Sequence, residues 1–121
     1  MDIPKFLKSF KYATHGILHV IKSEQNFRFH LLAAIIVLIA SMITGLSSLE
    51  WIIIIILISG MFMIELVNAS IERVVDLASP DFHQLALQAK DLAAGACLVY
   101  AISSAIVGFI IFIPKWWGII F

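Results

Sequence analysis

The segment ELVNASIERVVD, residues 65–76, decides how this chain folds, because its polar side chains directly follow the charge-free run WIIIIILISGMFMI. On a helix that turns about 100° per residue, four of these polar side chains fall within about 80° of one another. They are Glu65, Asn68, Glu72 and Asp76. We call this set the polar stripe. Ionisable groups at membrane depth are costly and usually mark a functional site, so the stripe indicates cation or phosphate chemistry at a membrane edge.

Charge-free runs predict three membrane-spanning helices. Residues 31–49 and 92–114 also carry no charge. A hydrocarbon core about 30 Å thick needs about 20 helical residues, so both runs are long enough, and the polar stripe completes the middle span. With 62% hydrophobic and 13% charged residues among 121, the composition indicates a small all-α integral membrane protein rather than a soluble domain. We expect one domain, 1–121, with membrane helices over 29–46, 51–76 and 88–113.

Basic residues are distributed unevenly around these spans. Five of the eight precede the first span, two flank the connection between the second and third, and the link over 45–50 has none. By the positive-inside rule, the N-terminus and the loop 77–88 face the cytosol, together with the polar stripe. Because the net charge is zero, no bulk attraction to nucleic acid is expected.

Residues 3–22 are expected to form an amphipathic helix on the membrane surface. Viewed down a helix, the apolar residues gather on one side, and the lysines and histidines gather on the other. A basic face opposite an apolar face is typical of a helix that lies on anionic lipid. Two interpretations stay open for this helix: a plain membrane anchor, and a lid over a site at the membrane edge.

Seven polar residues are expected near the cytosolic face: Glu24, Glu65, Asn68, Glu72, Asp76, Lys90 and Asp91. Oxygen ligands of this kind suit Mg²⁺, which usually keeps waters and is shared with substrate phosphates. A lysine would neutralise charge on a transferring phosphoryl group, and a carboxylate near a lipid hydroxyl would act as general base.

Two alternatives compete with a catalytic site. The first is an ordinary interfacial ion pair, in which Glu72 or Asp76 binds Arg73 or Lys90. The second is a small assembly that conducts cations along the carboxylates, which the five isoleucines after Trp51 disfavour. None of the four histidines pairs at metal-site spacing with a third ligand, so direct chemistry is not expected from them.

Four segments resemble the small prokaryotic diacylglycerol kinase/undecaprenol kinase family: EQNFR (24–28), ELVNASIE (65–72), VVD (74–76) and AKD (89–91). The resemblance extends over nearly the whole chain. It implies a homotrimer in the bacterial cell (inner) membrane, with sites shared between subunits, that transfers the γ-phosphate of ATP to a lipid hydroxyl with Mg²⁺. The residues it implicates are Glu65 as general base, Glu24 and Glu72 as Mg²⁺ ligands, Asn68, Lys90 and Asp91 as substrate- and nucleotide-positioning groups, and Asp76 as support.

The resemblance also bears on the acceptor lipid. The segment LAAGA (92–96) after AKD is similar to the Gram-positive undecaprenol branch, and the order Ala69-Ser70 departs from that of the diacylglycerol branch. We therefore expect undecaprenol as the acceptor, giving undecaprenyl phosphate, with diacylglycerol, giving phosphatidic acid, as the alternative. Lys5 stands where the other branch uses an arginine, and a lysine lacks the planar fork of donors.

Overall fold

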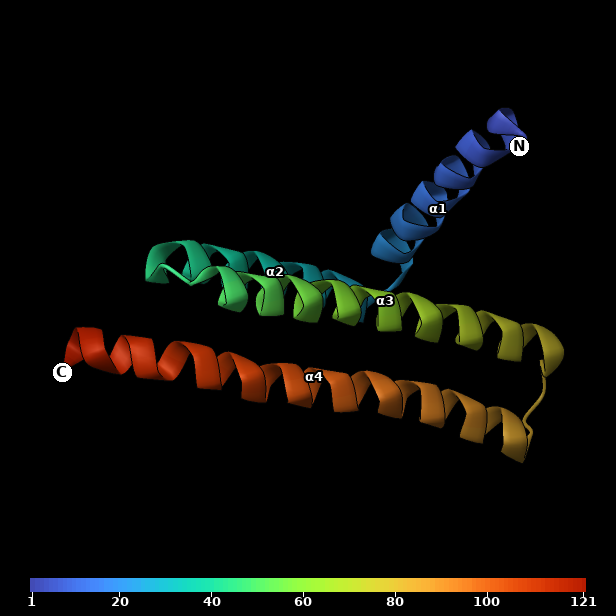
Figure 1. Ribbon diagram of the computed structural model, residues 1–121. Coiled ribbons are helices and arrows are strands. Elements are labelled where there is room, and N and C mark those ends of the chain that lie inside the picture. Colours follow the sequence, from blue (N-terminus) through green and yellow to red (C-terminus); the bar gives the residue numbers. More distant parts are fainter.

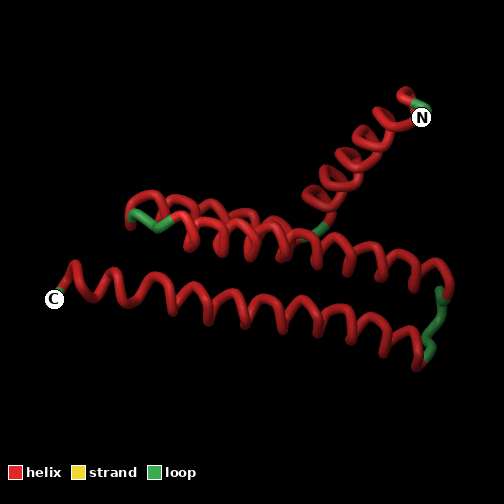
Figure 2. Tube along the Cα trace, viewed as in Figure 1, coloured by secondary structure: helices red, strands yellow, loops and turns green.

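The computed structural model describes all of residues 1–121 and contains four helices joined by short loops (Figure 2). The helices are α1 (Ile3–Ser23), α2 (Gln25–Thr44), α3 (Ser48–Ala78) and α4 (Gln84–Ile120). The last three run side by side, whereas α1 leaves this bundle at an angle (Figure 1). The predicted all-α fold is confirmed, and α2, α3 and α4 are each long and apolar enough to cross a membrane. The placement of α1 on a membrane surface stays a prediction.

The three apolar helices differ in length. α2 has 20 residues and spans about 30 Å, the thickness of a hydrocarbon core. α3 has 31 residues and α4 has 37, so they extend over about 46 Å and 55 Å. Both run past the point where α1 joins α2, towards the loop that connects them (Figure 1). They also exceed the expected spans 51–76 and 88–113, because terminal charges limit burial in lipid but do not limit helix formation.

The other end of the bundle is held by polar contacts. Ser47 and Glu50 form a capping box at the start of α3, in which each side chain accepts a hydrogen bond from the other residue's backbone N–H. Lys115 Nζ lies 3.0 Å from Glu50 Oε1, and Trp116 Nε1 donates to Thr44 Oγ1 at 2.9 Å. These contacts join the last turns of α4 to the α2–α3 connection, and α4 continues through Pro114.

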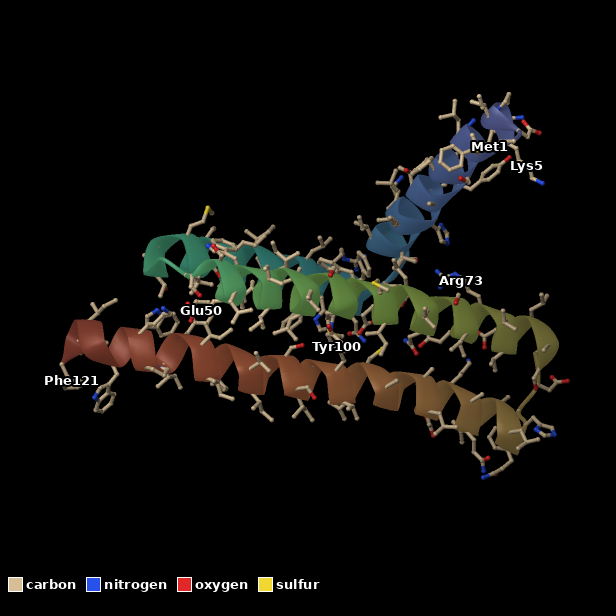
Figure 3. The ribbon with its side chains drawn as sticks, in the orientation of Figure 1. Met1, Lys5, Glu50, Arg73, Tyr100 and Phe121 are labelled. Atoms are coloured by element: carbon tan, nitrogen blue, oxygen red, sulfur yellow. The ribbon has the colours of Figure 1, made fainter.

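A glycine lets α3 and α4 pack closely in the middle of the bundle. The Tyr100 hydroxyl on α4 donates to the Ile56 carbonyl at 3.1 Å and crosses over Gly60 to reach it (Figure 3). A Cβ atom at Gly60 would overlap with the tyrosine hydroxyl. The contact fixes the register between α3, which carries the polar stripe, and α4, which carries Lys90.

Gly60→Ala is therefore expected to destabilise the folded protein by about 1–3 kcal/mol, because the added methyl group displaces Tyr100. The free energy of unfolding is measured by denaturant titration in detergent micelles. Gly95→Ala on α4 is the matched control, because nothing lies within 4 Å of a Cβ atom there. Equal stability of the two variants would show that the Tyr100 contact does not hold α3 against α4.

Candidate active site

The polar stripe lies along α3, and its burial falls from one end to the other. Glu65 is buried, with 7% of its surface exposed, whereas Asn68 and Glu72 are half-buried and Asp76 is exposed. Asn68 Nδ2 donates to Glu72 Oε1 at 3.2 Å, one helical turn further on. Asn68 Oδ1 is buried and has no hydrogen-bond partner. The stripe therefore joins a carboxylate shielded from water to groups that a water-soluble molecule can reach.

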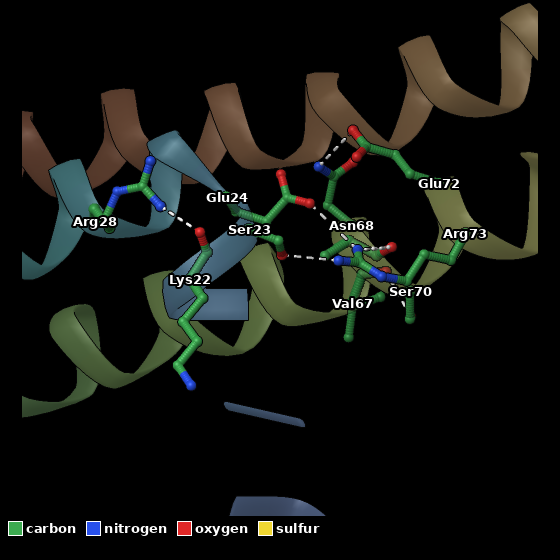
Figure 4. A network of polar contacts seen from close by, with 10 residues as sticks. Lys22, Ser23, Glu24, Arg28, Val67, Asn68, Ser70, Glu72 and Arg73 are labelled. Carbon is green, nitrogen blue, oxygen red and sulfur yellow. Dashed lines mark hydrogen bonds and ion pairs between the residues drawn. The ribbon is translucent and has the colours of Figure 1, made fainter. Parts of the chain in front are cut away.

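Glu24 lies in the short link between α1 and α2, and Arg73 of α3 reaches it. Arg73 Nη1 donates to Glu24 Oε1 at 3.2 Å, and Arg73 Nη2 donates to Ser23 Oγ at 2.9 Å (Figure 4). Arg28 binds the end of α1 by donating to the carbonyls of Ile21 and Lys22, both at 2.9 Å. The two arginines thus hold Glu24 beside the half-buried part of the stripe.

The α3–α4 contact brings together two other expected site residues. Lys90 of α4 forms an ion pair with Asp76 of α3. For Asp76, the interfacial ion pair left open by the sequence is therefore present. Asp91 is exposed, and no hydrogen bond or ion pair holds its side chain. A cavity of about 210 Å³ lies beside this pair, against the α3–α4 loop.

The two expected Mg²⁺ ligands, Glu24 and Glu72, each bind a different side chain in this structure. Glu24 is bound to Arg73, and Glu72 accepts from Asn68. No group of three or more His, Cys, Asp or Glu side chains converges in a way that would hold a metal ion. Two carboxylates and the unpartnered Asn68 Oδ1 are nevertheless the oxygen donors that Mg²⁺ accepts when waters and phosphate oxygens supply the rest. The residues fit Mg²⁺ carried by a nucleotide, and their role as its ligands stays a prediction.

His30 is the residue that sequence reasoning missed. Its Nε2 atom lies 3.3 Å from Glu65 Oε1, so the buried carboxylate of the stripe has a histidine from α2 as its partner. A signal was present, because His30 is the one ionisable residue within the expected span 29–46. A buried acid at membrane depth needs a partner, and His30 is the only such candidate on that helix.

An apolar cavity of about 470 Å³ extends between α2, α3 and α4. Of its 17 lining residues, 14 are hydrophobic. The lining begins at Phe29 and His30 and ends at Trp116, near the C-terminal end of α4. The cavity therefore extends along 29–37 of α2, 54–62 of α3 and 101–116 of α4, and His30, the partner of Glu65, lies at one end of it. This shape suits a long apolar chain whose polar head lies beside a buried carboxylate.

Comparison with known proteins supports the chemistry that this geometry allows. Residues 11–112 match the sequence profile of the prokaryotic diacylglycerol kinases. The chain belongs to the prokaryotic diacylglycerol kinase family. It is a membrane lipid kinase that uses ATP as phosphate donor, as the motifs predict.

Individual relatives of this family differ in the lipid that they are named for. The undecaprenol kinase of Bacillus subtilis is 48% identical over 114 residues, covering 94% of this chain and 93% of the relative. The diacylglycerol kinase of Synechocystis sp. is 35% identical over 112 residues, covering 92% and 64%. The diacylglycerol kinase of Helicobacter pylori strain J99 is 35% identical over 96 residues, covering 78% and 74%.

Proposed function

We propose that this kinase phosphorylates undecaprenol, giving undecaprenyl phosphate and ADP. The observation that carries the proposal is the buried Glu65 carboxylate, whose partner His30 lines one end of an apolar cavity. The higher identity to an undecaprenol kinase than to the diacylglycerol kinases supports the choice of acceptor. A polyprenyl alcohol has one hydroxyl at the end of a single chain of methyl-branched apolar units, which matches a largely hydrophobic cavity with His30 at one end.

In this proposal Glu65 is the general base. Its carboxylate takes the proton of the lipid hydroxyl as the lipid oxygen forms a bond to the γ-phosphorus of ATP. The bond between that phosphorus and the β–γ bridging oxygen breaks, and ADP leaves with the electron pair. Burial excludes water, which would otherwise compete with the lipid as acceptor.

The other polar residues bind and orient the nucleotide in the same proposal. Glu24 and Glu72 would hold Mg²⁺, which would neutralise charge on the phosphate oxygens. Asn68 offers its unpartnered Oδ1 to the substrate or to a water of the metal. Lys90 and Asp91 position the nucleotide at the exposed end of the stripe, where Asp76 supports Lys90 through their ion pair.

The proposed enzyme is a homotrimer with its sites on the cytosolic side of the membrane. The distribution of basic residues supports this orientation. The absence of a three-ligand cluster within the single chain is consistent with sites completed by a nucleotide or a second subunit. The cation-conducting alternative gains no support, because the cavity along the bundle is lined mostly by hydrophobic residues.

The test is transfer of labelled γ-phosphate from ATP to undecaprenol and to diacylglycerol, offered in parallel mixed micelles. We expect kcat/KM for undecaprenol to exceed that for diacylglycerol by at least about tenfold, since the chain is more similar to an undecaprenol kinase than to the diacylglycerol kinases. A preference for diacylglycerol would reassign the product to phosphatidic acid. Transfer to neither lipid by folded protein would refute both assignments.

A further inference from the structure

The partner of Glu65 differs in kind from the partners of the other paired carboxylates. Glu24 binds Arg73, Asp76 binds Lys90, and Glu50 binds Lys115, each a permanently charged group. Glu65 is the buried member of the series, and its only ion-pair partner is His30. Histidine is the side chain that gains and loses its charge near neutral pH.

This difference matters for a general base. An arginine or lysine would hold the carboxylate ionised permanently and weaken its attraction for the proton of a lipid hydroxyl. A neutral partner would leave a buried carboxylate without compensation for lost hydration. A histidine meets both demands, because its own proton can leave once the base has been protonated.

The two members of the His30–Glu65 pair differ in their exposure to solvent. The side chain of His30 retains 21% of its exposure, against 9% for that of Glu65, so His30 is the more accessible member of the pair. His30 lines the apolar cavity, whereas Glu65 is not among the lining residues and lies 3.3 Å from His30. Protons therefore reach water from Glu65 through His30 more easily than through the apolar lining.

The surroundings of Glu65 provide no competing cation. From α4 the Cys97 thiol approaches, and Glu72 lies further along α3. α1 contributes Val20 to the neighbouring apolar cluster, which also contains Phe27 of α2 and Ala69. Apart from His30, no cationic side chain lies within 4 Å of the Glu65 carboxylate.

We propose that His30 is the positioning residue of the candidate base Glu65. It fixes the carboxylate beside the cavity that His30 itself lines, and it supplies the positive charge next to that carboxylate until the lipid hydroxyl gives up its proton. After transfer, the imidazolium releases its proton to water, and the proton on Glu65 moves to His30. The carboxylate of Glu65 and the imidazolium of His30 are then both restored, and the proton that restores the imidazolium is the one taken from the lipid hydroxyl. This inference rests on the proposed lipid kinase function and adds to it the group that prepares and resets the base.

The experiment measures kcat and KM for undecaprenol across pH in His30→Gln, which keeps a hydrogen-bond donor but carries no charge. We expect kcat to fall by about 10- to 100-fold, with KM for the lipid changed by less than about threefold. The pH profile of kcat is expected to differ in shape from that of the wild type, because the neighbour of Glu65 no longer exchanges a proton with water. His30→Lys, whose permanent charge cannot leave, is also expected to lower kcat.

His15→Gln on α1 is the matched control and is expected to reproduce the wild-type profile, since His15 is exposed and the histidine that pairs with the polar stripe is His30. An unchanged pH profile in His30→Gln, or a defect confined to KM, would overturn the proposal. The activity of the wild-type protein distinguishes failure of this proposal from failure of the proposed function. If the wild type phosphorylates neither undecaprenol nor diacylglycerol, the lipid assignment fails. If it is active and His30→Gln matches it at every pH, only the role of His30 fails.

Discussion

Glu65→Gln is expected to lower the rate of phosphoryl transfer by about 10²–10⁴-fold while the protein stays folded. The amide has nearly the same shape as the carboxylate and can still hydrogen-bond to His30, but it cannot take the proton of a lipid hydroxyl. The rate is measured with labelled ATP and lipid in mixed micelles, beside gel filtration to confirm an unchanged assembly.

Glu50→Gln serves as the matched control for this variant. Glu50 is also a helical glutamate with a basic partner, yet it lies at the opposite end of the bundle and binds Lys115. We expect it to retain activity within about threefold of the wild type, because a partly exposed ion pair contributes little to stability. Near-normal turnover by Glu65→Gln would place the general base elsewhere in the chain.

Much of the fold follows from sequence because its cause is local. Runs without charge mark the three apolar helices, and the spacing of 65–76 places the polar stripe on one face of α3. The lengths of α3 and α4 are harder to predict from the sequence, because the helix ends depend on caps such as Ser47 and His83 rather than on hydropathy.

The partners of the site residues could not be read from the sequence in the same way. Arg73 and Glu24 are 49 residues apart, and His30 and Glu65 belong to different helices. Whether the members of each pair meet depends on the register between antiparallel helices. Hydrophobic periodicity in the sequence does not determine that register. The contact of Tyr100 with Gly60 is one packing detail that sets such a register. Neither residue on its own predicts this contact from the sequence.

In the proposed mechanism, the protrusion of α3 and α4 beyond α2 lets one site meet two very different substrates. The buried end of the stripe lies beside the apolar cavity, where a lipid alcohol belongs. The exposed end lies near the α3–α4 loop, about 16 Å further along the helix from Glu65 to Asp76. ATP is too polar to enter the cavity, so transfer requires a site that crosses the membrane edge.

Glu72→Gln tests the nucleotide-binding half of this arrangement. We expect the Mg²⁺ concentration for half-maximal activity to rise by about 10- to 100-fold, because the substitution replaces a charged oxygen ligand by a neutral one. At saturating Mg²⁺ and ATP, much of the rate should return, since Glu65 and its contact with His30 are untouched. The measurement is a Mg²⁺ titration of transfer at fixed ATP.

A purely structural role for Glu72 predicts a different result. The hydrogen bond that Glu72 accepts from Asn68 is the observation that supports this alternative to metal binding. Glutamine can still accept from the Asn68 amide, so a purely structural glutamate would leave the Mg²⁺ titration unchanged. Binding of Mn²⁺ with a non-hydrolysable ATP analogue, followed by electron paramagnetic resonance, gives a readout that does not depend on turnover. Weaker Mn²⁺ binding in Glu72→Gln, but not in Glu50→Gln, would assign the metal to the polar stripe. Equal binding in the two variants would remove Glu72 from the ligand set and leave Glu24 as the remaining carboxylate beside Asn68 and Arg73.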